Sequence, residues 1–272
     1  MSRNGIPYLM YHEIEAPNRR VTQNHQGYLR YVVSEKTFRD QMKLIADTGS
    51  TGCDVTSALR TKDNEKVVAI TFDDGCETDL LIAAPVLKEH SFGATFYVVA
   101  GFVGQPGYLS ISQLRDLSEA GFEIGSHSMT HSYLKSLDNA QLRSEIFDSK
   151  DRLEQMTGRR VDHFSCPGGR WESRVSELAK EAGYLSVATS EIGLNLPKTD
   201  PYHLARIAVL RSTPDRSFAA MCHGEGLAMR RLKSLVLDKA KDVLGNSTYD
   251  RIRAGMLSGD KTNKADLGAF RN

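Results

Sequence analysis

The stretch Val67-Val68-Ala69-Ile70-Thr71-Phe72-Asp73-Asp74-Gly75 opens with an apolar, β-branched run and ends in two adjacent carboxylates and a glycine. Such a run is typical of a strand buried on both faces, as in a parallel sheet. Neighbouring like charges repel each other and lose hydration when they are partly buried, so Asp73 and Asp74 need a cation, a solvated rim, or both. Because α/β proteins build their sites at the carboxyl ends of strands, the stretch predicts a functional site at its end.

A second polar stretch follows about fifty residues later. Residues 121–126 read as another strand, which continues into His127-Ser128-Met129-Thr130-His131. Two imidazoles four residues apart can share one face of a helical turn and bind one metal ion. Together with Asp74 they would make a site of two histidines and one carboxylate with positions open for water, a ligand set that suits Zn²⁺, Fe²⁺, Mn²⁺ or Co²⁺.

These two motifs resemble those of the polysaccharide deacetylases of the NodB-homology type, carbohydrate esterase family 4. The resemblance is carried by Thr71-Phe72-Asp73-Asp74-Gly75 and His127-Ser128-x-x-His131, and it extends from about Val67 to Ile207. The alternation of strands and helices alone predicts either a parallel barrel or a doubly wound sheet. The resemblance implies the first of these, an α/β fold in the form of a distorted, incomplete (β/α) barrel with parallel strands.

The resemblance also implies a reaction and roles for four residues. The reaction is removal of an N-acetyl group from an amino sugar, a glycan or a glycan precursor, with a metal-bound water as nucleophile. Asp74, His127 and His131 would hold a divalent metal, with zinc expected first and cobalt, manganese or iron as alternatives. Asp73 would be the general base, since one carboxylate has to stay free to take the proton of the water.

The third motif of the family is altered here. The family has an arginine that steadies the catalytic aspartate, and this position is Ser165, at the start of Ser165-Cys166-Pro167-Gly168-Gly169. We expect Arg170, just after the motif, to supply this charge and to act in catalysis.

Three neighbouring residues are expected to contact the substrate. The backbone N–H of Gly168 or Gly169 would help the metal to hold the developing oxyanion. Trp171 would stack on a sugar ring, although a tryptophan at the start of a helix also serves packing.

The last family motif, a Leu-x-His that supplies the general acid, is not found after the run from Arg206 to Leu210, and no histidine follows it until His223. The candidates for this acid are His223, which we take as the catalytic residue, and His203, His12 and His163. His12, which ends a short strand from Pro7, is also expected near the substrate at the rim of the site.

Three segments organise the chain. Residues 1–66 form an N-terminal strand, loop and helix that pack on the barrel, residues 67–212 form the deacetylase core, and residues 213–272 form a helical C-terminal extension of the same domain. Within the core, Ser110-x-x-Gln113 and Asp138-x-x-Gln141 are capping boxes that predict the starts of two helices.

Composition limits the alternatives. The chain of 272 residues has a formal net charge of +1, and 25% of its residues are charged. This charge balance does not indicate nucleic-acid binding. The four cysteines are widely spaced, a pattern that suits free thiols in a reducing compartment. No apolar run is long enough to span a membrane, and residues 1–5 lack the apolar core of a signal peptide. We therefore expect a cytoplasmic protein and leave its oligomeric state open.

The sequence thus predicts a metal-dependent N-deacetylase with a carbohydrate or glycan precursor as its substrate. The altered third motif and the missing acid leave room for two other functions. One is hydrolysis of another non-peptide C–N bond, as in a cyclic imide or ureide, on the same scaffold. The other is glycan binding without catalysis, against which the free carboxylate of Asp73 argues.

Overall fold

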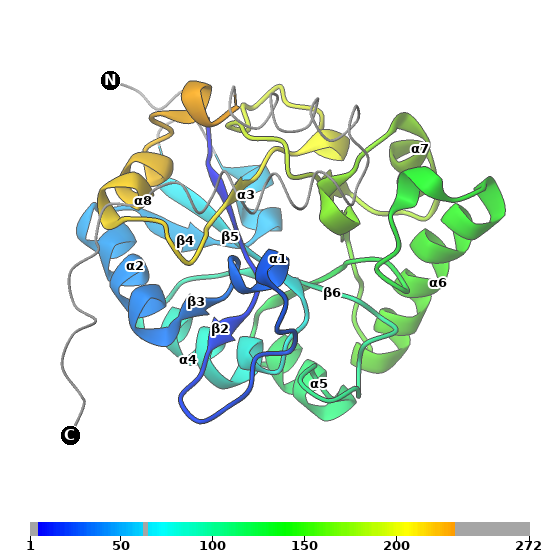
Figure 1. Cartoon of the computed structure of the whole chain (residues 1–272). Coiled ribbons are helices and arrows are strands. Elements are labelled where there is room, and N and C mark those ends of the chain that lie inside the picture. Colours follow the sequence, from blue (N-terminus) through cyan, green and yellow to red (C-terminus); the bar gives the residue numbers. More distant parts are fainter. Residues whose placement is uncertain (1–4, 62–64, 232–272) are drawn as a thin grey trace.

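Eight parallel strands form the central sheet of the protein (Figure 1). The structure, a computed structural model, describes residues 5–61 and 65–231, so most of the predicted C-terminal extension lies outside the described residues. The strand order is β10-β1-β5-β6-β7-β8-β9, and β4 pairs with the first residues of β5. The strands are β1 (Tyr8–Tyr11), β4 (Thr51–Cys53), β5 (Val67–Asp74), β6 (Thr95–Val98), β7 (Glu123–Ser126), β8 (His163–Ser165), β9 (Ser186–Ala188) and β10 (Ile207–Ala208).

The segment before β10 links the two ends of this sheet. Leu204 donates its backbone N–H to the carbonyl of Val187 and accepts from the N–H of Thr189, both at 2.9 Å. Three residues later the same chain pairs with β1, where Ile207 lies opposite Leu9. The sheet is therefore curled into a distorted, incomplete (β/α) barrel, which confirms the fold class that the resemblance implied.

Helices surround the outside of the barrel (Figure 1). A π-helical turn, Asp79–Ala83, leads directly into α4, and Pro85 lies in the first turn of that helix. The two predicted capping boxes are both formed, at the starts of α5 and α6. The helices are α1 (Gln26–Leu29), α2 (Glu35–Asp47), α3 (Val55–Arg60), α4 (Ala84–Glu89), α5 (Ile111–Glu119), α6 (Asn139–Thr157), α7 (Ser173–Glu181) and α8 (Asp215–Cys222).

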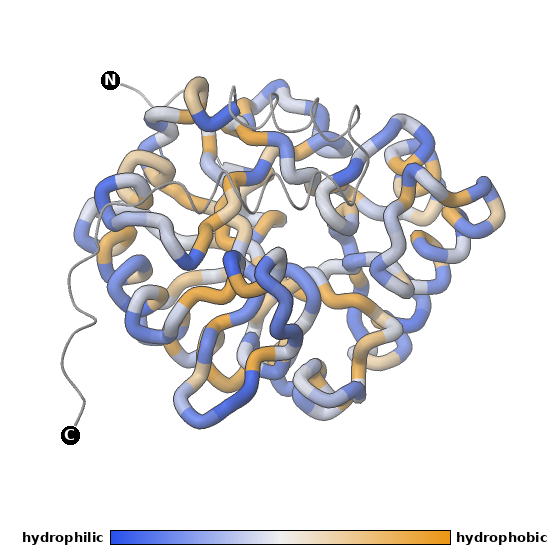
Figure 2. Tube along the Cα trace, viewed as in Figure 1, coloured by the Kyte–Doolittle hydropathy of each residue, from blue (hydrophilic) through white to orange (hydrophobic). Residues whose placement is uncertain are grey.

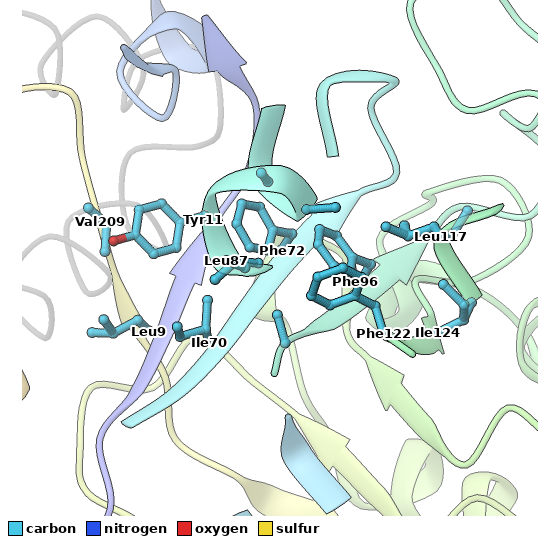
Figure 3. Packing of buried hydrophobic residues seen from close by; sticks show 14 of the residues in the cluster. Leu9, Tyr11, Ile70, Phe72, Leu87, Phe96, Leu117, Phe122, Ile124 and Val209 are labelled. Atoms are coloured by element: carbon cyan, nitrogen blue, oxygen red, sulfur yellow. The ribbon is translucent and has the colours of Figure 1, made fainter. Parts of the chain in front are cut away.

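The main apolar core lies between the strands and these helices. Figure 2 shows hydrophobic stretches along the strands and hydrophilic stretches along much of the periphery. A row of rings crosses β1, β5 and β6: the ring centroids are 5.3 Å apart between Tyr11 and Phe72, and 4.7 Å apart between Phe72 and Phe96. Phe96 and Phe122 lie side by side in Figure 3, in an edge-to-face arrangement with their ring centroids 5.5 Å apart. Because side chains alternate along a strand, the neighbours of these rings, Asp73 among them, point into the barrel.

The inside of the barrel is partly polar. At its amino-terminal end, His163 accepts or donates a 2.8 Å hydrogen bond with Ser186 and lies 3.2 Å from a carboxylate oxygen of Glu123. Each of these residues is the first of its strand. Gly125 on β7 leaves room for Tyr97, since a Cβ atom there would lie 2.4 Å from the ring. The interior therefore combines paired polar groups with a small buried apolar cluster that includes the rings of Tyr8 and Tyr97.

Two parts of the N-terminal segment differ from what the sequence suggested. Residues 13–33, expected to be loop, contain α1 and a two-stranded sheet of β2 (Ile14–Glu15) and β3 (Val33–Ser34), which are too short to show a period. β4 and α3 were not expected at all. β1 and β4 pair with β5, so the N-terminal segment supplies strands of the barrel itself.

None of the helices in residues 5–61 and 65–231 combines the length and the apolar character that crossing a bilayer requires.

The row of rings yields a prediction about stability. Replacing Phe96, which is fully buried between Phe72 and Phe122, by alanine should lower the free energy of unfolding by about 3–5 kcal/mol, because a cavity replaces the ring. Phe147 on α6 is partly buried and lies under the guanidinium of Arg143, so Phe147→Ala should cost about 1–2 kcal/mol. Denaturant unfolding of both variants measures the difference, and equal losses would contradict this account of the core.

Candidate active site

Three predicted ligands meet at the carboxyl ends of the strands. Asp74 is the last residue of β5 and lies opposite Val98 of β6, which in turn lies opposite Ser126 of β7. His127 follows Ser126 directly, so it emerges at the height of Asp74, and His131 follows in the same loop. One ligand atom of each of Asp74, His127 and His131 lies within 4.8 Å of the others. The juxtaposition follows from the parallel register.

The chemistry of these atoms fits a divalent cation. Nε2 of His127 and Nε2 of His131 lie 3.7 and 3.4 Å from Oδ1 of Asp74. Nδ1 of His127 lies 2.9 Å from the carbonyl of Ser165 and donates to it, which leaves Nε2 as a bare lone pair. Oδ1 of Asp74 is buried and accepts no hydrogen bond. Ligand atoms around tetrahedral zinc lie about 3.4 Å apart, so a cation would resolve the repulsion of three facing acceptors.

The protonation states of the ligands point the same way. Burial lowers the pKa of His127 to about 3 and also lowers the pKa of His131, so both imidazoles are neutral, as metal ligation requires. Burial, together with the charges of Asp73 and Glu13, raises the pKa of Asp74 to about 6, against the opposing charge of His12. A carboxylate in this position lacks the positive charge that a bound cation would supply.

The backbone of the site is strained. Asp74, Ser128 and His131 have φ angles of 83°, 68° and 63°, in the left-handed region that side chains disfavour. They are three of the five non-glycine residues with positive φ in the described part of the chain. Each such residue costs about 1–3 kcal/mol and persists only where its surroundings hold it, which is a mark of functional sites.

Asp73 forms a buried ion pair with Arg206, which lies far from it in the sequence. Nη1 and Nη2 of Arg206, two residues after Leu204, donate to the two carboxylate oxygens of Asp73 at 2.7 and 2.8 Å. Both side chains are buried, and 133 residues separate them in the chain. A bidentate pair of this kind fixes both the position and the orientation of the carboxylate.

The guanidinium of Arg206 is satisfied on its other sides as well. Nε donates to the carbonyl of Thr189 at 2.8 Å, Nη2 to the hydroxyl of Ser165 at 2.7 Å, and Nη1 to that of Thr71 at 3.3 Å. The resemblance places Ser165 at the position of the family's arginine, and here its hydroxyl accepts from Arg206, which reaches this place from the segment just before β10.

The expectation that Arg170 supplies the charge beside Asp73 is therefore wrong. The guanidinium of Arg170 lies over the ring of Tyr133, 3.9 Å from its centroid, on the 3₁₀ turn after β8. Local spacing in the third motif suggested Arg170, whereas the replacement comes from a different part of the fold.

The pairing decides the protonation of Asp73. Burial by itself would raise the pKa of this carboxyl, but the charge and the hydrogen bonds of Arg206 hold it well below its ordinary value. Oδ2 of Asp73 lies 3.9 Å from Nε2 of His127, so the carboxylate borders the metal ligands. Asp73 is thus an ionised acceptor that does not need to ligate the cation.

His12 is the candidate acid that lies at this end of the barrel. Tyr11 pairs with Phe72, so His12 follows β1 at the height of Asp73. Its ring stacks on Tyr31 with centroids 4.5 Å apart, and its buried Nδ1 has no hydrogen-bond partner. Its charge favours the ionised forms of Asp73 and Asp74.

His223, taken as the catalytic acid from sequence, lies elsewhere. It caps the carboxyl end of α8, and the next residue, Gly224, packs on Leu194. The neighbouring Asn195 pairs with Ile6, just before β1, so His223 lies near the amino-terminal end of the barrel. The connection after β10 carries the chain down the outside of the barrel, which is why the assignment of His223 is wrong.

The other two candidates have structural partners. His163 belongs to the polar cluster at the amino-terminal end of the barrel. His203 stacks on Trp171, with ring centroids 4.1 Å apart, and its Nε2 lies 3.1 Å from Glu191.

The other three residues expected to contact the substrate are Gly168, Gly169 and Trp171. The N–H of Gly169 donates to the carbonyl of Cys166 at 2.8 Å, so it is not available to an oxyanion. Gly168 is exposed on the same turn, after the strand of Ser165. The indole N–H of Trp171 donates to Ser176 and to the carbonyl of Tyr202, which fixes this ring in the packing around α7, and its stacking on a sugar ring stays a prediction.

The chain has relatives among known proteins. A profile of the polysaccharide deacetylase family matches residues 60–187. The Bacillus subtilis protein YxkH, which bears a polysaccharide deacetylase name, is 31% identical over 220 residues, 79% of this chain and 75% of that protein. The peptidoglycan-N-acetylglucosamine deacetylase of Bacillus cereus is 34% identical over 128 residues, 47% of this chain and 58% of that enzyme.

Solved structures share the fold. A polysaccharide deacetylase from Bacillus cereus superposes with a TM-score of 0.69 at 27% identity, over 80% of this chain and 69% of that one. The deacetylase PplD of Streptococcus pyogenes, solved with acetate, gives a TM-score of 0.72 at 24% identity, over 80% of this chain and 98% of that one, a likeness of fold alone. The matched profile and the extent of the likeness to YxkH show that this chain belongs to the polysaccharide deacetylase family, the NodB-homology proteins of carbohydrate esterase family 4.

Proposed function

We propose that the protein is a metal-dependent N-deacetylase that removes acetyl groups from the amino sugars of a glycan. The observation that carries the proposal is the arrangement of two carboxylates with different partners. Asp74 faces two neutral imidazoles and pairs with no lysine or arginine of the described residues, while Asp73 beside it is neutralised by Arg206. One acid is thus available as a metal ligand and the other as a proton acceptor.

Asp74, His127 and His131 would hold the divalent ion, zinc in the first place, which when bound acidifies water and polarises an amide carbonyl. Asp73 takes the proton of the attacking water. Its lowered pKa makes it a weak base, so the site works only where the water itself is made acidic, and this requirement supports metal dependence.

Two further groups complete the proposed reaction. The backbone N–H of Gly168, at the rim beside Ser165, donates to the carbonyl oxygen as negative charge develops on it. His12, with an unpartnered ring nitrogen at the height of Asp73, gives a proton to the leaving amine. His12 would take the place of the histidine of the family's last motif.

Relatives support a glycan substrate, because the Bacillus cereus enzyme is named for peptidoglycan N-acetylglucosamine. The expectation of an intracellular precursor stays a prediction. An acetate-release assay on peptidoglycan, chitooligosaccharides, lipid-linked sugars and acetylated sugar nucleotides separates these substrates. Release of a dicarboxylic half-amide from a cyclic imide, in place of acetate from any glycan, would overturn the proposal.

Asp73→Asn is the central test of the reaction. The substitution removes the proton acceptor and keeps the shape, so acetate release should fall by about 10²–10⁴-fold while the metal content of the purified protein stays unchanged. Asp74→Asn should instead reduce the bound metal itself. If the unchanged protein binds metal and neither it nor Asp73→Asn releases acetate from any glycan, the non-catalytic binding function is favoured.

Arg206 can be tested by moving its charge. Arg206→Ala leaves Asp73 buried and unpaired, which should cost about 3–5 kcal/mol of stability and most of the activity. Adding Ser165→Arg puts a guanidinium at the family's usual position, so the double variant should regain both stability and acetate release in part. Thermal unfolding and kinetics of the two variants measure this, and a double variant no better than Arg206→Ala would contradict the pairing account.

The role of His12 can be tested through the leaving group. An amine has to be protonated as it leaves, whereas a nitrophenolate does not, so His12→Gln should slow deacetylation of an N-acetyl sugar by about 10²-fold or more and that of 4-nitrophenyl acetate much less. His203→Gln, at a histidine in the packing around Trp171, is the matched control and should affect neither reaction. Equal losses on both substrates in His12→Gln would show that His12 is not the proton donor.

A further inference from the structure

The loop that carries both histidines is bound from behind by an acid on α6. One carboxylate oxygen of Glu145, Oε2, accepts the backbone N–H groups of Met129 and Thr130, each at 2.9 Å. The other, Oε1, accepts the hydroxyl of Thr130 at 2.5 Å. Glu145 is 7% exposed, whereas Met129 is half-buried and Thr130 is exposed, so the carboxylate reaches the loop from the protein side.

The opposite side of the loop is bound by backbone alone. The N–H groups of Ala100 and Gly101 donate to the carbonyls of Ser128 and Met129, at 3.0 and 2.8 Å. A Cβ atom on Gly101 would lie 2.5 Å from the carbonyl oxygen of Met129, so the two chains touch closely. The loop is therefore held between the connection after β6 and the side chain of Glu145.

The two histidines depend on this arrangement to different degrees. The ring of His127 is fixed separately, because its Nδ1 donates to Ser165. His131 is placed through its backbone, whose N–H donates to the hydroxyl of Ser128 at 3.0 Å, and both of these residues are left-handed. Without the bonds to the residues between them, a strained pair of this kind would relax and carry the imidazole of His131 away from Asp74.

We propose that Glu145 is a positioning residue for the metal site, which holds His131 in ligating geometry through the main chain of Met129 and Thr130. The inference rests on the proposed metal-dependent function. Replacing a residue with a merely structural role would lower mainly the stability of the fold. Replacing Glu145 should instead change the metal affinity and the ligand geometry more than the stability.

The experiment compares four variants by calorimetric titration with Zn²⁺ and by the visible spectrum of the Co²⁺ protein. Glu145→Ala should weaken Zn²⁺ binding by about 10–100-fold and change the Co²⁺ bands, since groups that orient ligands have effects of this size. Glu145→Gln keeps an oxygen that can accept from the two N–H groups, so its Zn²⁺ affinity should be close to that of the unchanged protein. Thr130→Val removes one of the three hydrogen bonds, so its Zn²⁺ affinity should lie between those of the two Glu145 variants.

Glu154→Ala is the matched control. Glu154 lies on the same helix, pairs with Lys150 at 2.8 Å and accepts the N–H of Val161 at 2.9 Å, so its loss also breaks an ion pair and a backbone contact. Its variant should lose stability and keep the Zn²⁺ affinity and the Co²⁺ spectrum.

The outcomes separate the two proposals. If the unchanged protein binds Zn²⁺ and Glu145→Ala binds it equally well with the same spectrum, the role of Glu145 is refuted and the metal site stands. If the unchanged protein binds neither ion, both proposals fall together. Should Glu145→Ala not fold, Thr130→Val decides: a weaker Zn²⁺ affinity supports the inference, and an unchanged one refutes it.

Discussion

Two adjacent carboxylates at the end of one buried strand are the constraint on which the site depends. Asp73 and Asp74 are 2% and 6% exposed, so each needs positive charge close by. The protein provides it for one of them, through the buried guanidinium of Arg206. The other, Asp74, faces neutral imidazoles and pairs with no lysine or arginine of the described residues, so burial raises its pKa and leaves one oxygen without a hydrogen-bond partner. The difference between the two partners assigns the two acids to different chemical tasks.

Much of this was predictable from local pattern. The run from Val67 to Asp74 forms a fully buried strand, and both capping boxes start helices where the sequence predicts them. The meeting of the three predicted metal ligands follows directly from their spacing within a parallel sheet. Such features depend on neighbours in the chain or on the register of adjacent strands, and a single sequence carries that information.

The partner of Asp73 could not be found in this way. Arg206 acts across 133 residues, and nothing in the third motif points to it. The one signal is an arginine directly before the apolar residues 207–210, which is costly for a residue entering a barrel unless it is paired. The assignments of Arg170 and His223 failed for the same reason, because both were chosen by nearness in sequence. Glu145 was missed because a helix acid usually faces water, and burial is visible only in the fold.

The position of Arg206 in the sequence also has a consequence for the synthesis of the protein. This arginine lies just before β10, the last strand of the barrel, well after the residues 60–187 that the family profile covers. Translation that has produced every recognisable motif has therefore not yet produced the arginine that pairs with Asp73. Under the proposed function, a product truncated before Arg206 would retain all the recognisable motifs and still lack the counter-ion of its proton acceptor.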